Sequence, residues 1–275
     1  MAEAGAKKIG WIGTGVMGKS MAAHLMAKGH TLYVYTRTAS KADELVAAGA
    51  TFMEPVEIAK QADYIFLMLG FPQDVRDIVL KEGTGILHHM KSGATLVDHT
   101  TSSPALAVEI AELGASRGIH SVDAPVSGGD IGAKNGKLVV MVGGTEAGVA
   151  SVRDLLDIYS LNVQHMGAPG AGQHTKMANQ IMIATTMVGL CESLLYAQKA
   201  NLDHQQMISL LKAGAAGSFS LEKLGPRMLT RDFEPGFYVE HFVKDLGIVL
   251  DESRIMNLSV PGTALAYQLY QAMMA

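Results

Sequence analysis

A glycine-rich turn near the amino terminus constrains the fold more than any other feature of this sequence. The spacing Gly13-x-Gly15-x-x-Gly18 follows a short apolar run and opens a helical pattern over Val16–Lys28. Glycines at this spacing permit a tight strand-to-helix turn, close approach of a pyrophosphate, and tight packing of helix on strand. The helix N-terminus adds unpaired N–H groups for phosphate. The pattern predicts a dinucleotide site, with a purely structural turn as the alternative, at Gly13, Thr14, Gly15, Val16, Met17 and Gly18.

Strand-like and helix-like segments alternate over the first 165 residues. The β-rich apolar runs are Lys8–Gly13, Thr31–Tyr35, Tyr64–Met68, Thr95–His99, Ile119–Ala124 and Leu138–Gly143. The helical patterns are Val16–Lys28, Ser40–Ala48, Pro55–Gln61, Pro72–Val79, Ser103–Arg117 and Thr145–Tyr159. Such alternation predicts an α/β Rossmann domain with a doubly wound, mainly parallel sheet. After Gly172 only helical patterns follow, so we expect a dinucleotide-binding domain over 1–165 and an all-α domain over 166–275. A helix over about 172–200 would link them.

Composition excludes several classes of protein. A net charge of −4 with 17% charged residues lacks the basic footprint of a nucleic-acid binder. The single cysteine, Cys191, cannot form an intramolecular disulfide, and its apolar neighbours predict a small core residue. The histidines show no metal-ligand spacing, so no metal site is expected.

Two segments bear on location in the cell. Met1–Lys8 lacks the apolar stretch of a signal peptide. The apolar run Ile181–Leu195 is interrupted by polar residues and predicts a buried or subunit-facing helix instead of a membrane span. We therefore expect a soluble cytoplasmic protein without membrane partners, or a mitochondrial or plastid one if a targeting peptide has been removed.

The end of the second strand bears on cofactor choice. NAD-selective sites place an acid about 20 residues after the glycine turn, where it binds the ribose hydroxyls. Here Thr36, Arg37 and Thr38 follow the strand, with no acid among them. The Arg37 guanidinium could bind a 2′-phosphate, with the two hydroxyls as partners. The sequence predicts NADP(H) as the preferred cofactor and NAD(H) as a possible one. The alternative is an ordinary surface arginine beside an unselective site.

Two further loops follow strand ends, where open α/β sheets bind ligands. Met68 and Leu69 follow the third strand and could pass their backbone along the adenosine or ribose. Thr101 follows the fourth strand and is placed for the nicotinamide region. Ser103, which precedes Pro104, is typical of a helix N-cap.

The segment Gly170–Asn179 carries the strongest catalytic signal. Lys176 and Asn179 are three residues apart, so both would lie on one helix face. The sequence around them is almost free of charge from Ala168 to Cys191. Desolvation beside apolar groups can lower the pKa of a lysine towards neutrality, which suits it to proton transfer. The alternative is a solvated surface lysine.

Two other motifs point to a substrate. Ser127, Gly128 and Gly129 follow the fifth strand, where a hydroxyl and successive N–H groups can form a nest for a small carboxylate. A plain glycine turn is the alternative. Lys244 and Asp245 lie in a later helical pattern. The lysine could face a cofactor phosphate while the aspartate binds substrate or orients Lys244 or Lys176; the alternative is a solvated ion pair.

In order and spacing, these motifs resemble the β-hydroxyacid dehydrogenase family, which includes 3-hydroxyisobutyrate dehydrogenases and glyoxylate/succinic semialdehyde reductases. The resemblance spans essentially the whole chain, although family members usually continue past Ala275. It implies a Rossmann domain and a helical domain that forms homodimers or homotetramers. It also implies that Lys176 is the general acid/base. The residues that it implies hold the substrate are Ser127, Gly128, Gly129 and Asn179.

The activity implied by the resemblance is hydride transfer between a nicotinamide and a small β-hydroxy acid or semialdehyde. Glyoxylate, succinic semialdehyde, methylmalonate semialdehyde and tartronate semialdehyde all fit a carboxylate nest beside a lysine. A non-catalytic dinucleotide-binding scaffold is one alternative, because folds are reused without their chemistry. An imine reductase-like enzyme on the same fold is another. The presence of Lys176 argues against both.

Overall fold

The computed structural model describes residues 5–234 and 236–275. It contains two compact units, one ending at Lys176 and the other running from Met177 to Ala275. The domain boundary expected near residue 165 stays a prediction. The prediction that Met1–Lys8 holds no signal peptide falls partly outside the described residues.

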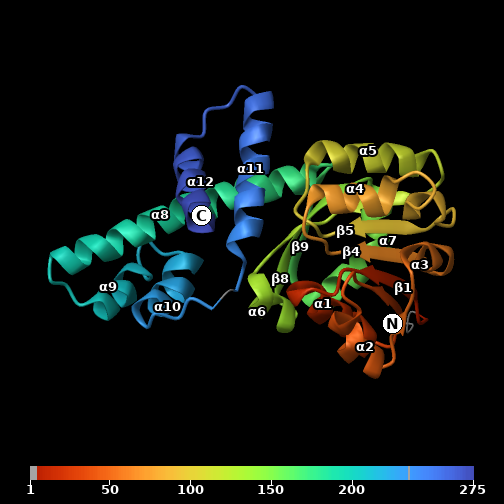
Figure 1. Ribbon diagram of the computed structural model, residues 1–275, viewed down its shortest axis with the longest axis horizontal. Helices are drawn as coiled ribbons and strands as arrows, with labels where there is room; N and C mark the ends of the chain where they lie inside the picture. Colours follow the sequence, from red (N-terminus) through yellow and green to blue (C-terminus); the bar gives the residue numbers. More distant parts are fainter. Residues whose placement is uncertain (1–4, 235) are drawn as a thin grey trace. The chain divides into compact units, whose positions relative to one another are not determined.

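The first unit is built on a nine-stranded sheet, counted over the described residues (Figure 1). Six parallel strands run in the spatial order β3-β2-β1-β4-β5-β6. In chain order they are β1 Lys8–Ile12, β2 Thr31–Tyr35, β3 Thr51–Phe52, β4 Tyr64–Leu67, β5 Thr95–Asp98 and β6 His120–Asp123. This is the order of the doubly wound dinucleotide-binding fold, whose direction of winding reverses between β1 and β4. The predicted fold class is confirmed, and the carboxyl ends of β1 and β4 mark the expected ligand site.

The remaining strands depart from the prediction. β8 (Leu138–Gly144) was expected, but it pairs antiparallel with β6 and with β7 (Val126–Ser127), and parallel with β9 (Ser160–Gly167). The sequence did not predict β3, β7 or β9. β3 and β7 each have two residues, too few to show a pattern. β9 buries only Val163 among its side chains, so it lacks the continuous apolar run by which the other strands were found.

Helices cover both faces of this sheet (Figure 1). One core cluster packs α1, α6 and α7 on the sheet, and the other packs α3, α4 and α5 on the opposite face. Proline at the first helical position starts α3, α4 and α5, and the Ser103 hydroxyl caps α5 as expected. The helices are α1 Val16–Ala27, α2 Asp43–Ala47, α3 Pro55–Gln61, α4 Pro72–Leu80, α5 Pro104–Ala115, α6 Gly129–Lys134 and α7 Glu146–Leu156.

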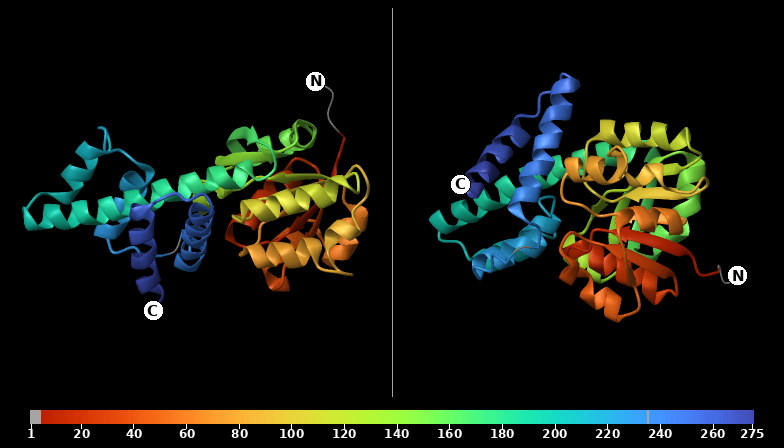
Figure 2. Two further views of the ribbon diagram at one scale, coloured as in Figure 1. Left: turned by 90° about the horizontal axis from the view of Figure 1, so that it is seen from above. Right: turned by 45° about the vertical axis from the view of Figure 1, so that its right-hand side comes forward.

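The second unit consists of helices and connecting loops, with no strand among its described residues. Helix α8 begins in the first unit and continues without a break (Figure 2). A small core forms where Ala184 of α8 packs with Phe242, Leu246 and Ala266 of α11 and α12. Pro235, where the Pro-Gly pair with Gly236 predicts a break between helices, lies outside the described residues. The helices are α8 Ala171–Lys199, α9 His204–Leu211, α10 Gly225–Leu229, α11 Val239–Ile255 and α12 Pro261–Met274, with a π-helical turn over Ser220–Leu224.

Helix α8 corrects one prediction. Cys191 is exposed and is not a core residue. Apolar residues are spread around all sides of α8, so composition alone could not tell its buried face from its outer face. By length and composition α8 could also cross a membrane, and only 22% of its most apolar window is buried. Met182, Leu195 and Tyr196 are exposed on it. A wholly buried helix is therefore excluded, and the subunit-facing alternative stays a prediction.

Candidate functional site

The three glycines of the turn after β1 meet three different surroundings. Gly13 has φ of 103°, and a Cβ there would lie 2.2 Å from the Met68 carbonyl oxygen. A Cβ on Gly18 would lie 2.0 Å from the Gly13 carbonyl oxygen. A Cβ on Gly15 would have no atom within 4 Å. Gly13 and Gly18 are therefore required by the protein's own packing, whereas Gly15 keeps space open for a ligand.

The start of α1 fits the phosphates of a dinucleotide. Gly15 is the N-cap and provides no side-chain cap, and the first turn carries no acid. The Thr14 side chain is buried, and its hydroxyl has no hydrogen-bond partner among the described residues. Val16 is exposed, while the partly buried Met17 packs against the core. Unpaired donors at a helix N-terminus are a binding site for anions.

Arg37 lies beyond the end of β2 and is held by a residue that sequence reasoning missed. Its Nη1 donates to Asp74 Oδ1 at 3.0 Å, and the other oxygen of Asp74 accepts the Phe71 N–H at 3.2 Å, which caps α4. The Arg37 side chain is nevertheless 78% exposed, so one edge of the guanidinium is fixed while most of it faces solvent. Thr36 is half-buried and Thr38 is exposed. The capping position of Asp74 after Pro72 was the signal that could have found it.

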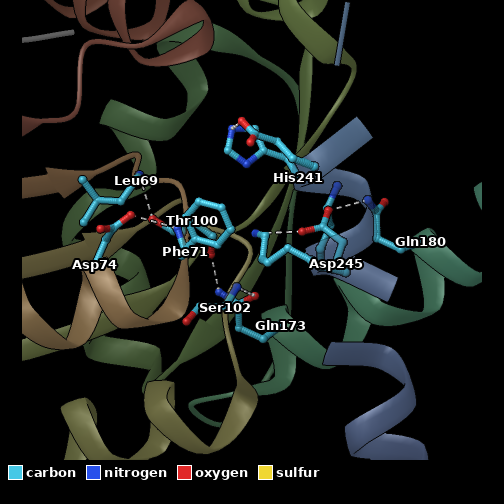
Figure 3. A network of polar contacts seen from close by, with 12 residues as sticks. Leu69, Phe71, Asp74, Thr100, Ser102, Gln173, Gln180, His241 and Asp245 are labelled. Carbon is cyan, nitrogen blue, oxygen red and sulfur yellow. Dashed lines mark hydrogen bonds and ion pairs between the residues drawn. The ribbon is translucent and has the colours of Figure 1, made fainter. Parts of the chain in front are cut away.

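The loops after β4 and β5 are tied to each other. The Leu69 N–H donates to Thr100 Oγ1 at 2.9 Å (Figure 3), and the Thr100 N–H donates to Asp98 Oδ1 at 2.9 Å. Met68 lies against Gly13, so the expected adenosine loop adjoins the glycine turn. Thr101 is half-buried in the second of these loops.

The start of α8 is fixed by Asp123, the last residue of β6. Its Oδ1 accepts the Gly170 N–H at 2.8 Å, and its Oδ2 accepts the Gln173 N–H at 2.9 Å. A carboxylate at a helix N-terminus is favoured by the helix dipole. Burial raises the pKa of Asp123, and the hydrogen bonds from Gly170 and Gln173 oppose that rise. A Cβ on Gly143 or Gly172 would lie within 2.8 Å of its carboxylate oxygens, so both positions must stay small.

Gln173 makes a second attachment in the first turn of α8. It is fully buried; its Nε2 donates to the Thr100 carbonyl at 2.7 Å, and its Oε1 accepts the Ser102 N–H at 3.0 Å (Figure 3). Helix α8 is thus fastened both to the end of β6 and to the loop after β5. Sequence reasoning assigned no role to Asp123 or Gln173, although the glycines around Gln173 hinted at close packing.

Lys176 follows one turn later and is buried, with 7% of its surface exposed. Its Nζ donates to the Val126 carbonyl at 2.9 Å. Val126 is followed in the chain by Ser127, Gly128 and Gly129, and the two glycines have φ of 127° and 64°. The solvated-lysine alternative is therefore wrong. The structure brings the candidate proton donor against the segment expected to hold a carboxylate.

The motif residues of the second unit form a buried polar chain of their own. Asn179 Nδ2 donates to Gln180 Oε1 at 2.7 Å. Gln180 Nε2 donates to Asp245 Oδ2 at 2.7 Å (Figure 3). Asp245 Oδ1 pairs with Lys244 Nζ at 2.8 Å, and both side chains are largely shielded from solvent. The solvated ion pair is thus excluded. The roles of Asn179, Lys244 and Asp245 towards substrate and cofactor stay predictions.

A buried aromatic cluster lies beneath the loops of the first unit. His99 is fully buried, and this burial lowers its pKa to about 4. The neutral ring contacts the Ala124 carbonyl through Nδ1 at 2.6 Å and the Tyr159 hydroxyl through Nε2 at 2.9 Å. Nδ1 therefore carries the hydrogen and Nε2 accepts from Tyr159. His99 directly precedes Thr100 and so links the core to the loop after β5.

Two models of known protein families match this chain and together cover most of it. A family model for the NAD binding domain of 6-phosphogluconate dehydrogenase matches residues 8–167. A second model, for the NAD-binding domain of NADP-dependent 3-hydroxyisobutyrate dehydrogenase, matches residues 170–275. The chain belongs to the β-hydroxyacid dehydrogenase family. Membership confirms the resemblance seen in the sequence, the two-part fold and the NAD(P)-binding class.

Individual members of the family match over almost the whole chain. A probable 3-hydroxyisobutyrate dehydrogenase-like protein of Arabidopsis thaliana, described as mitochondrial, is 51% identical, covering 98% of this chain and 80% of the relative. The 2-hydroxy-3-oxopropionate reductase of Escherichia coli is 37% identical, covering 96% and 90%. The structure of Mycobacterium tuberculosis 3-hydroxyisobutyrate dehydrogenase with L-serine superposes with a TM-score of 0.89 at 27% identity, covering 98% and 94%.

The burial of His99 generates a prediction about pH and stability. Its folded-state pKa is about 4, below the usual 6.5, so the unfolded chain binds the proton more readily. The stability from the neutral ring is present above pH 6.5 and is lost as the pH falls towards 4. Between pH 7.5 and pH 5 we expect the free energy of unfolding to fall by about 2 kcal/mol more in the wild type than in His99→Gln. Urea unfolding at the two pH values measures this difference, and equal losses would contradict the assignment of a neutral buried ring.

Proposed function

We propose that this protein is an NAD(P)H-dependent oxidoreductase acting on a small β-hydroxy acid or the corresponding semialdehyde. One observation carries the proposal: the buried Lys176 Nζ lies 2.9 Å from the Val126 carbonyl, next to Ser127, Gly128 and Gly129. A proton donor is thereby set beside a turn able to hold a carboxylate. The Escherichia coli reductase and the Mycobacterium tuberculosis dehydrogenase act, by their names, on small carboxylates that carry a hydroxyl or an aldehyde.

The cofactor would be held at the carboxyl ends of β1, β4 and β5. The open position of Gly15 and the unpartnered Thr14 hydroxyl support phosphate binding there. When bound, the nicotinamide ring supplies or accepts hydride. The residues proposed to hold the cofactor are Gly13, Thr14, Gly15, Val16, Met17, Gly18, Thr36, Arg37, Thr38, Met68, Leu69, Thr101 and Lys244.

Lys176 would act on the proton of the reacting oxygen. In reduction its ammonium gives a proton to the developing alkoxide, and in oxidation its neutral amine takes the proton of the hydroxyl. The Val126 carbonyl orients Nζ by accepting one of its hydrogen bonds. Asn179, three residues further along α8, would position the substrate, with Asp245 as a further contact. The burial of Lys176 favours this enzyme over a non-catalytic scaffold or an imine reductase-like activity.

The carboxylate of the substrate would bind at Ser127, Gly128 and Gly129. Gly128 and Gly129 carry no side chain that could cover their N–H groups, and the serine hydroxyl adds a third donor. Fixing the carboxylate in this way leaves the neighbouring carbonyl or hydroxyl carbon facing Lys176. Orientation of this kind is worth several orders of magnitude in rate.

NADP(H) is the proposed preference. Arg37 is held by Asp74 through one nitrogen while its side chain remains 78% exposed, which leaves a fixed cation at the place where a 2′-phosphate would lie. No acid directly follows β2 along the chain, and the Asp74 carboxylate beside Arg37 accepts hydrogen bonds from Arg37 and from the Phe71 N–H. NAD(H) would bind through the same glycine turn without this contact.

Replacing the lysine tests the proposed chemistry. Lys176→Ala removes the proton donor, so kcat for reduction of semialdehydes should fall at least about a hundredfold. The affinity for NADPH should stay within about twofold, because the glycine turn is untouched. Lys134→Ala, on the outer part of α6, is the matched control and should keep full activity. The measurement is the initial rate with glyoxylate, succinic semialdehyde, methylmalonate semialdehyde and tartronate semialdehyde. A fully active Lys176→Ala enzyme would defeat the assignment.

The cofactor preference is tested at the arginine. Arg37→Ala should raise the Kd of NADPH roughly 10- to 100-fold, the usual cost of losing hydrogen bonds to a charged group, and should leave the Kd of NADH nearly unchanged. Titration of nicotinamide fluorescence gives both constants. Arg76→Ala, which removes an exposed arginine of α4, serves as the control. Equal losses for both cofactors would refute a 2′-phosphate contact.

We also propose that the protein is a cytoplasmic or organellar homo-oligomer that binds neither nucleic acid nor membrane. Exposed apolar side chains on α8 and α12 support a contact with a second copy, since large exposed patches mark interfaces. They are Met182, Leu195, Tyr196, Leu265, Leu269 and Met273.

Light scattering after gel filtration tests the assembly. The wild type should show two or four times the chain mass of 29.1 kDa. The double variant Leu195→Glu, Tyr196→Glu should shift to the monomer, because burying the added charges in an interface is costly. Leu161→Glu, at an exposed position of β9, should not change the mass. A monomeric wild type at tens of micromolar would contradict the proposal.

A further inference from the structure

The chain contains one tryptophan, Trp11, two residues before the first glycine of the dinucleotide turn. It is fully buried on β1, and its Nε1 donates to the Gly13 carbonyl at 3.0 Å. The indole stacks on Phe66, with ring centroids 5.3 Å apart and planes 11° apart. The edge of Tyr159 meets it at 6.3 Å and 89°, and His99 lies 5.9 Å away. Packing on several sides therefore fixes the direction of the indole N–H.

The hydrogen bond to Gly13 determines how the next peptide is turned. The peptide between Gly13 and Thr14 is planar and trans, so its carbonyl and its N–H point in opposite directions. Because the carbonyl is held towards Trp11, the Thr14 N–H is directed away from the core. The carbonyl is also enclosed by α1, since a Cβ on Gly18 would lie 2.0 Å from it and 3.0 Å from Trp11 Nε1.

We propose that Trp11 is a positioning residue for the cofactor: its indole N–H sets the Gly13–Thr14 peptide so that the Thr14 N–H faces the bound pyrophosphate. The inference rests on the proposed function in one respect, that a dinucleotide binds at this turn. Phenylalanine would fill much of the same space but has no donor. The distinguishing contribution of Trp11 is therefore one directed hydrogen bond, which acts on the phosphates common to NADPH and NADH.

The test compares Trp11→Phe with Tyr159→Phe. Both variants remove one buried donor from the same aromatic cluster, but Tyr159 bonds His99 and has no bond to the turn. Trp11→Phe should raise the Kd of NADPH and of NADH alike, roughly tenfold, because the Gly13 carbonyl loses its donor and the peptide can rotate. At saturating cofactor, kcat should stay within about twofold. Tyr159→Phe should lower the melting temperature similarly and leave both Kd values unchanged.

Other outcomes overturn the inference. If the Kd values of Trp11→Phe change less than about twofold, the hydrogen bond does not position the turn. If Tyr159→Phe weakens binding as much, the effect comes from general softening of the core. A wild-type enzyme that binds neither NADPH nor NADH would instead overturn the proposed function, and the role of Trp11 with it. If Trp11→Phe weakens the binding of NADPH but not of NADH, the effect lies at the 2′-phosphate near Arg37, and Trp11 does not position the pyrophosphate.

A measurement on the wild type covers the case in which Trp11→Phe does not fold. Labelling with ¹⁵N-tryptophan gives a single indole N–H resonance, because the chain has one tryptophan. Saturation with NADPH or with NADH should shift this resonance, since the acceptor carbonyl belongs to the peptide that faces the phosphates. A resonance that stays in place at saturation with both cofactors would refute the positioning role.

Discussion

The carboxylate of Asp123 is the contact on which the proposed site depends. It ends β6 and accepts two N–H groups at the start of α8, one on each oxygen. An α-helix rises about 1.5 Å per residue and is stiff over a single turn, so fixing the first turn also fixes Lys176 one turn later. Gly143 and Gly172 leave the space that this contact needs, because a side chain at either would occupy the place of the carboxylate. The position of the amine is thereby set by a strand of the sheet.

Hydrogen bonds from uncharged side chains hold the other parts of the site in place. Gln173 joins α8 to Thr100 and Ser102, His99 joins the same loop to Ala124, and Trp11 joins β1 to its own turn. Each is buried, where an unpaired polar atom would cost free energy, so these bonds also specify a single arrangement of the loops. The loops that follow β1, β5 and β6 are in this way held at one edge of the sheet. In doubly wound folds that edge is where ligands bind.

The sequence was sufficient to predict features that depend on residues close together in the chain. It did not predict features that depend on contacts between residues far apart in the chain. The glycine turn, the strands of the parallel sheet and the shared face of Lys176 and Asn179 are all visible within a few residues. Asp123, by contrast, meets its partners 47 and 50 residues away, and Gln173 meets Thr100 at 73. Strand β9 exposes most of its side chains, and Cys191 lies on a helix whose apolar residues are spread around all sides. In both cases burial is decided by packing, which no local pattern records.

The burial of Lys176 connects this packing to chemistry. Removing an ammonium from water costs free energy and favours the neutral amine. An opposite charge within about 4–6 Å has the reverse effect and favours the ammonium. The turn Ser127–Gly129 follows Val126, the residue whose carbonyl accepts from Nζ, so a carboxylate held there would bring such a charge close. Attraction between that carboxylate and Nζ is stronger in a site shielded from water, so it would add to the hydrogen bond of Val126 in holding Nζ towards the substrate.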